Sequence, residues 1–375
     1  MKVTSQKELM AEQARSAVRI SGAHHSSWNR RQTVADPDRK IRGAVKWDNT
    51  IEYNEAAVNE PVREMFANAR VYNQDPETLR SYREAIKTVL HENTHLLAAE
   101  GTDHSDAKYA FQNIPGTRAL EEGITEVYSY NNLNDYIEDL GLEEIAPGIS
   151  TAEARPSYKQ FTPAAQRFAE SIGRRSGLES SEVVRQLAVV NAADKFRVAA
   201  EILYDNSDLA GLVPDQERDA AVRRIETAMR PAFASLRDMD HLDADQVRRQ
   251  SAKAGANSVQ AAAGEMNKIR TQWTAPAPGQ QVTRGPQQQA SQRTQQQPEQ
   301  AQEVSDQSQH GPQQAVPVEA RAGGSQSSEL QNAMRAGLSG TAQMSSARPL
   351  AAGEQGARRG GGQVGQERQG PERGE

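Results

Sequence analysis

Two histidines, His91 and His95, are the side chains of this sequence best suited to chemistry. They stand four residues apart in the stretch HENTH, with a glutamate, Glu92, beside the first. Four residues are slightly more than one turn of an α-helix, so both imidazoles lie on one face and can reach the same ion. The chain has seven histidines and no cysteine, which makes this pattern rare by chance and excludes thiolate ligands and cysteine nucleophiles. The stretch therefore predicts a metal site with a carboxylate next to it.

These residues require a helix to position them. The sequence predicts one that follows Asp75 as its N-cap, has Pro76 at its first position and stops at Gly101. Its apolar residues form one stripe at helical spacing. The members of that stripe are Leu79, Tyr82, Ile86, Val89, Leu90 and Leu97. The two histidines point the other way, which suits a metal that lines a cleft.

A catalytic zinc ion normally has three protein ligands and a water, and the stretch ALEEGITEVYSY supplies a candidate for the third. With it, the region from Thr78 to Tyr130 resembles the gluzincin class, the thermolysin-like zinc metallopeptidases in which HExxH on one helix is joined by a glutamate from a following helix. The resemblance implies that Glu122 is the third ligand of a Zn²⁺ ion. It also implies that Glu126, one turn later, hydrogen-bonds a ligating histidine.

The resemblance further implies a zincin-like fold and the hydrolysis of peptide bonds in a peptide or protein substrate. In such chemistry Glu92 takes a proton from the zinc-bound water and delivers it to the leaving amine. A donor for the developing oxyanion is also required. The candidates, which the sequence leaves unranked, are Tyr109, Tyr128, Tyr130, Tyr158 and His104.

Three other residues compete with Glu122 for the place of third ligand. Glu121 is adjacent to it, but the residue four positions later is Thr125 and not a carboxylate. Asp106 is the runner-up, because GTDHSDAKYA is similar to the aspartate motif of the aspzincin peptidases, although two extra residues intervene. His104 is similar to the third histidine of the metzincins but lies three positions too late, which favours a loop residue near the cleft.

Composition divides the chain. Only 36% of the residues are hydrophobic and 5% are aromatic, which is low for a fully folded protein. Residues 275–375 are rich in Gln, Gly, Pro, Ser, Ala and Arg and are predicted to form a disordered tail. Residues 1–40 are polar and are predicted to be a flexible arm with at most a short helix at 6–18. Residues 41–274 remain as the folded domain.

The fold class predicted for residues 41–274 is mainly α (α+β), with a small N-terminal strand element and a helical C-terminal lobe. Residues 41–54 alternate apolar and polar side chains around Asp48-Asn49 and predict a strand or hairpin. The remainder has helical periodicity. Besides the helix that follows Asp75, helices are expected at 54–72, 117–141, 163–175, 180–204, 215–236 and 244–273.

Charge and hydropathy bear on partners and location. The formal net charge is −6, and nine arginines in residues 275–375 balance nine acidic residues there, so the domain is mildly acidic. We therefore expect no nucleic-acid partner. No apolar run approaches the length of a membrane span and no signal peptide is evident, so a cytoplasmic location without a membrane partner is expected, with non-standard export left open.

Two other functions stay open at this stage. One is a regulatory or binding protein that retains a metalloprotease-like fold without catalysis. The other is a toxin or effector protease delivered by a specialised export system. A further pair of histidines, His24-His25, is interpreted as an exposed loop pair.

Overall fold

The computed structural model describes residues 2–73, 75–237, 239 and 241–274. Within these residues the protein is mainly helical, as predicted, and no helix there is long and apolar enough to cross a membrane. The predicted tail, residues 275–375, lies outside the described residues. The principal helices are α1 (Gln6–Ser21), α2 (Glu60–Tyr72), α3 (Pro76–His95), α4 (Lys108–Asn113), α5 (Thr117–Asn131), α6 (Leu133–Leu140), α7 (Leu142–Ile145), α8 (Thr162–Ser176), α9 (Ser180–Ala188), α10 (Lys195–Asp205), α11 (Leu209–Leu212), α12 (Arg218–Ala234) and α13 (Ala244–Thr274).

Short strands form two small sheets. The larger has the order β2-β4-β3, built from β2 (Gln32–Val34), β3 (Gly43–Val45) and β4 (Ile51–Tyr53). Of the two possibilities predicted at 41–54, a strand or a hairpin, the structure has the hairpin, since β3 and β4 are antiparallel with Gly43 opposite Tyr53. Strand β2 adds to β4 in parallel. The smaller sheet pairs β1 (His25–Ser26) with β5 (Leu97–Ala98). Because β5 follows α3 directly, this pairing places the segment around His25 next to the C-terminal end of that helix.

The short helix expected at 6–18 is present as α1, but the prediction that it belongs to a flexible arm at 1–40 is wrong. Helix α1 begins after Ser5, whose side chain accepts a hydrogen bond from the Glu8 amide, and it packs on α3 and α6. Its inward face includes the fully buried Leu9, Gln13 and Ala17, spaced four residues apart. Because Leu9 is the one large apolar residue among the buried side chains of α1 and the others are polar or small, hydropathy did not reveal this face.

Gln13 shows how a polar residue can occupy a core position. Its side-chain oxygen accepts hydrogen bonds from the Tyr53 hydroxyl at 2.7 Å and from the Asn93 amide at 2.9 Å, and its backbone carbonyl accepts one from the Tyr136 hydroxyl at 3.1 Å. A buried polar group is tolerated when such partners satisfy it. Gln13 therefore connects α1 to β4, α3 and α6 through hydrogen bonds.

Several predicted helices have different ends or are interrupted. The Asp75 cap is confirmed, because its side chain accepts from the Glu77 and Thr78 amides, but α3 ends at His95 and not at Gly101. The helix expected at 117–141 is divided into α5 and α6 near Asn132, and the one expected at 180–204 is divided into α9 and α10. The helix expected at 54–72 begins with a π-helical turn, Glu55–Asn59. The 3₁₀ turns are His104–Ala107, Asp215–Glu217 and Ser235–Arg237.

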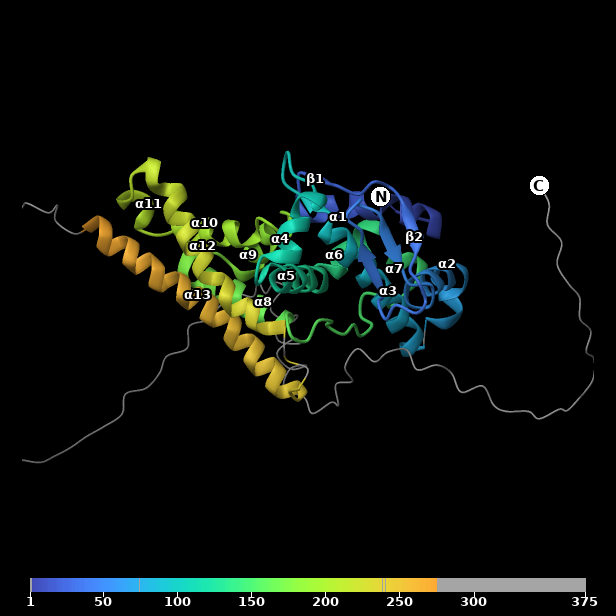
Figure 1. Ribbon diagram of the computed structural model, residues 1–375. Coiled ribbons are helices and arrows are strands. Elements are labelled where there is room, and N and C mark those ends of the chain that lie inside the picture. Colours follow the sequence, from blue (N-terminus) through green and yellow to red (C-terminus); the bar gives the residue numbers. More distant parts are fainter. Residues whose placement is uncertain (1, 74, 238, 240, 275–375) are drawn as a thin grey trace, which may run out of the picture. The chain divides into compact units, whose positions relative to one another are not determined.

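Buried apolar side chains form two clusters. The first core joins α1, the larger sheet, α2, α3, α6 and α7, and the second core joins α5 with α8 to α13. Figure 1 shows α13 running along α8 and α12, and these helices are in direct contact. Helices α3 and α5 pack against each other, so they form the boundary between the two cores. The residues predicted to bind metal lie on these two helices.

Candidate metal centre

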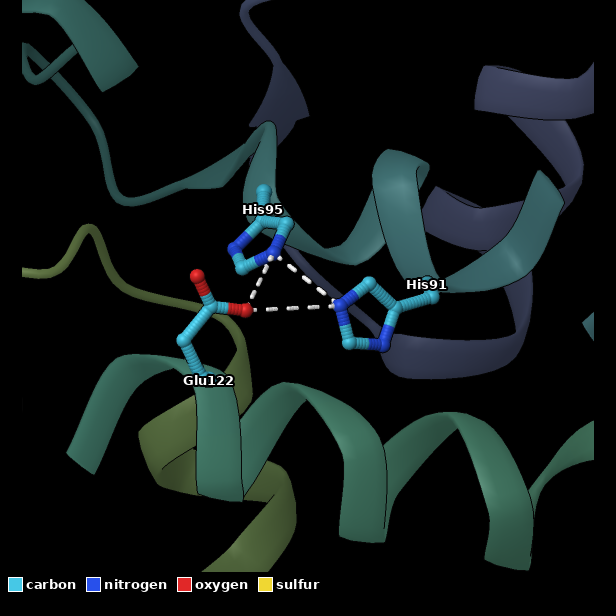
Figure 2. Close-up of side chains that lie close together, drawn as sticks. All are labelled: His91, His95 and Glu122. Atoms are coloured by element: carbon cyan, nitrogen blue, oxygen red, sulfur yellow. Dashed lines mark hydrogen bonds and ion pairs between the residues drawn. The ribbon is translucent and has the colours of Figure 1, made fainter. Parts of the chain in front are cut away.

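His91, His95 and Glu122 come together between α3 and α5, as Figure 2 shows. The two histidine Nε2 atoms are 3.2 Å apart. Glu122 Oε2 lies 3.7 Å from His91 Nε2 and 3.6 Å from His95 Nε2. All three residues are buried, with exposed fractions of 4%, 9% and 8%. Three ligand atoms of the types zinc prefers thus form a nearly regular triangle inside the protein.

The triangle fits a tetrahedral ion. Zinc–nitrogen and zinc–oxygen bonds of about 2.0–2.1 Å at a tetrahedral angle place neighbouring donors about 3.3 Å apart, close to the separations observed here. Glu122 Oε2 is buried without a hydrogen-bond partner. A buried carboxylate oxygen without a donor is costly unless a cation faces it, and either the two histidines in their charged form or a bound metal ion can be that cation. The donor set and its spacing therefore suit a zinc ion, which would be held by these three side chains.

Each histidine presents its second ring nitrogen to a carboxylate on α5. His95 Nδ1 hydrogen-bonds Glu121 Oε1 at 2.6 Å, and His91 Nδ1 lies 3.1 Å from Glu126 Oε2. Such partners fix the orientation of an imidazole and leave Nε2 free for a metal. The structure thus places Glu126 beside His91. Glu121, the rival for third ligand, lies behind His95.

A buried lysine lies next to each of these carboxylates. Lys87 Nζ is 2.7 Å from Glu126 Oε1, and Lys195 Nζ is 3.2 Å from Glu121 Oε2. Both lysines are almost fully buried. Neither lysine belongs to a motif that the sequence indicates. Lys87 could have been found, because it precedes His91 by one helical turn, but Lys195 lies in α10 and no local pattern connects it to the site.

The charges around the triad shift its protonation. Burial alone would lower the pKa of each histidine, but the carboxylates outweigh it: Glu122 and Glu126 raise the pKa of His91 to about 9, and Glu121 and Glu122 raise that of His95 to about 10.

The pKa values of two of these carboxylates shift in the opposite direction. Burial would raise the pKa of Glu121, but Lys195 and His95 lower it to about 2. The pKa of Glu122 is also lowered, since both histidines outweigh its burial. The metal-free site therefore holds protonated histidines between carboxylates.

Glu92, the predicted proton carrier, is buried with an exposed fraction of 4%. Its side chain packs against Gly43 in β3, where a Cβ atom would lie only 2.7 Å from Glu92 Oε1. Burial is the largest influence on its pKa and raises it, although the two histidines act in the opposite direction. A carboxyl group with a raised pKa is suited to accepting and returning a proton near neutral pH.

The structure distinguishes the candidates for the oxyanion donor. The ring of Tyr158 stacks on His91 with centroids 5.4 Å apart, and burial followed by the charge of Glu122 raises its pKa. Tyr109 is exposed, Tyr128 lies in the second core, and Tyr130 does not stack on either triad histidine. His104 Nδ1 is 3.1 Å from the His95 carbonyl oxygen, and burial lowers its pKa to about 4. Tyr158 is therefore the tyrosine placed at the triad.

The remaining sequence candidates lie elsewhere. Asp106 is exposed and caps the turn His104–Ala107, where its side chain accepts a hydrogen bond from the Asp103 amide at 2.8 Å. The group of possible ligands found among the described residues does not include it. His24 and His25 are a surface pair with Nδ1 atoms 3.3 Å apart.

Comparison with known proteins does not place the chain in a family, because no family model, curated protein or solved structure matches it.

Proposed function

We propose that this protein is a zinc-dependent metallopeptidase that hydrolyses peptide bonds, with a zincin-like core in which α3 and α5 carry the ligands. The observation that supports the proposal most is the triangle of His91, His95 and Glu122 with Glu92 on the same helix as the histidines. A bound zinc ion would supply a Lewis acid that polarises a substrate carbonyl and lowers the pKa of a water. The substrate is a peptide or a protein.

The chain's own residues have separate roles in this proposal. Glu92 accepts a proton at its carboxylate and returns it to the leaving amine. Tyr158 donates a hydrogen bond from its hydroxyl to the oxyanion, a role favoured by its stacking on His91. Glu121 and Glu126 hold the two imidazoles in place through Nδ1.

The test uses the full chain, purified without chelator, with zinc measured by elemental analysis and hydrolysis measured by mass spectrometry on a proteome-derived peptide library. We expect close to one zinc per chain. Glu92→Gln should keep the zinc and lower kcat/KM by at least about 100-fold, the usual contribution of a general acid–base group. Glu77→Gln, at an exposed position in the first turn of α3, is the matched control and should leave both measurements unchanged.

The alternative function, a regulatory or binding protein without catalysis, makes the opposite prediction. A chain that carries one zinc, cleaves no peptide of the library and behaves identically with Glu92→Gln would refute the peptidase proposal. A chain that binds no zinc would refute the metal centre as well.

A further inference from the structure

A segment without regular structure lies between α7 and α8. Residues 146–161 form no helix or strand, yet they carry Tyr158, whose ring covers His91 in parallel at an interplanar angle of 10°. Tyr158 has a φ angle of +50°, a left-handed conformation that is unfavourable for a non-glycine residue and that surrounding contacts must hold in place. Contacts from α3 and α5 hold this segment over the triad.

Lys87 of α3 makes two of these contacts. Its Nζ donates hydrogen bonds to the Arg155 carbonyl at 2.6 Å, the Ser157 hydroxyl at 3.2 Å and Glu126 Oε1 at 2.7 Å. An ammonium group has three donors, so all of them are used, and two of them go to the segment. Lys87 is in α3, one turn before His91, and its side chain has an exposed fraction of 5%.

Glu126 connects the same segment to the triad. Its Oε1 accepts hydrogen bonds from Lys87 and from the backbone amide of Ser157 at 2.6 Å. Its Oε2 lies 3.1 Å from His91 Nδ1. One carboxylate therefore orients a candidate ligand with one oxygen and anchors the segment that carries Tyr158 with the other.

We infer that Lys87 is a positioning residue that fastens residues 155–158 to the metal centre through Glu126, so that His91 and the ring of Tyr158 are placed by one buried ion pair. As a role in the centre, this rests on the proposed function. Lys195 provides the contrast within the molecule. It forms an ion pair with Glu121 behind His95, but its hydrogen bonds go to the carbonyls of Leu187 in α9 and of Val190 just after that helix.

The test is hydrogen exchange measured by mass spectrometry on the full chain in the presence of a chelator, so that its outcome does not depend on zinc or on activity. Lys87→Met should raise the exchange rate of peptides within residues 150–161 by about tenfold, because the anchored amides there then open more often. Lys195→Met is the matched control. It removes an equally buried lysine next to a carboxylate–histidine pair and should leave these peptides at the wild-type rate while speeding exchange near residues 187–195.

A second variant, Ser157→Ala, tests the same inference if the Lys87→Met chain does not fold. It removes one acceptor of Lys87 and should speed exchange in the same peptides by about twofold while the rest of the chain keeps its protection. In a parallel zinc titration, Lys87→Met should weaken binding about tenfold, because Lys87 holds the carboxylate of Glu126 that lies beside His91.

The outcomes separate this inference from the proposed function. Unchanged exchange at 150–161 in Lys87→Met, or in Ser157→Ala if the first variant is unfolded, would overturn the inference. An equal rise in Lys195→Met would also overturn it, because the effect would then reflect a general loss of buried charge. Local opening in Lys87→Met together with no zinc binding in the wild-type chain would keep the anchoring role and reject the metallopeptidase.

Discussion

At the scale of single residues, both ring nitrogens of His91 and of His95 have neighbours that could bind or orient them. The Nε2 atoms face each other and Glu122, while the Nδ1 atoms face Glu126 and Glu121. The sequence suggested His91, His95, Glu122 and Glu126 from their spacing along helices. It assigned no role to Glu121 as a partner of His95, because the contact joins two helices and depends on how each is rotated.

The choice of third ligand can be tested by substitution. Glu122→Gln should weaken zinc binding by more than about 100-fold, because a neutral amide replaces a buried carboxylate that would bind the metal directly. Loss of a residue that only hydrogen-bonds a ligand costs at most about 100-fold. Asp106→Asn, at an exposed capping position, should leave the zinc affinity unchanged. Competition titration with a chromophoric chelator measures both. The reverse ranking would favour the aspzincin-like alternative.

The raised pKa values of the histidines predict how zinc binding depends on pH. A histidine must lose its proton before its nitrogen can bind a metal. Because the pKa values of His91 and His95 in the metal-free site are about 9 and about 10, both are protonated at neutral pH, and the apparent affinity should fall as the pH decreases below 9. The steepest expected change is about tenfold per pH unit for each proton released.

Calorimetry in buffers of different ionisation enthalpy counts the protons directly. We expect about two protons released per zinc at pH 7.5, one from each histidine. Because His24 and His25 form a second histidine pair on the surface, the same measurement on a chain with both changed to alanine provides the control. Binding that releases no protons would contradict the protonation assigned to the triad.

At the scale of elements, the edge strand β3 and helix α3 meet where Gly43 faces Glu92. The sequence predicted the hairpin and the N-terminal cap of α3, because alternation and capping are local properties. It misplaced the C-terminal end of α3, since Leu96 and Leu97 could continue an apolar stripe. The tertiary structure ends the helix at His95 because Leu97 pairs with Ser26 of β1.

The close approach of β3 to α3 predicts the effect of a single methyl group. In Gly43→Ala, the new Cβ would lie 2.7 Å from Oε1 and 2.8 Å from Cγ of Glu92, so the carboxylate must move. We expect the variant to bind zinc as the wild type does but to hydrolyse peptides at least about tenfold more slowly, since a small displacement of a catalytic group is costly. Equal losses of zinc and activity would show that the sheet supports the whole centre and not Glu92 in particular.

At the scale of the molecule, the candidate centre lies where two hydrophobic cores meet. Helix α3 belongs to the first core and α5 to the second, so the positions of the ligands depend on the packing of both. In the second core α13 crosses α8 at Gly255, where a Cβ would lie 2.1 Å from the Ala164 carbonyl oxygen. The backbones of these helices approach so closely only because this residue is glycine.

That contact predicts a large effect of Gly255→Ala on stability. The added methyl group forces α8 and α13 apart, which should lower the free energy of unfolding by about 1–3 kcal/mol, as expected for overpacking. Gly264→Ala, on the same helix with no atom within 4 Å of its Cβ, should instead raise it by up to about 1 kcal/mol through helix propensity. Urea unfolding of the two variants and the wild type measures both. Equal effects would contradict the close packing.

The sequence by itself determined the properties that depend on neighbours along the chain. These are the helical character of the protein, the Asp75 cap, the hairpin, and the common helical face of His91 and His95. Only the tertiary structure decided how α1 packs and which carboxylate accompanies which histidine. It also decided that Lys87 and Lys195 pair with Glu126 and Glu121 and that Tyr158 stacks on His91. The physical reason is that these contacts join segments far apart in sequence, where position depends on the packing of two cores and not on local periodicity.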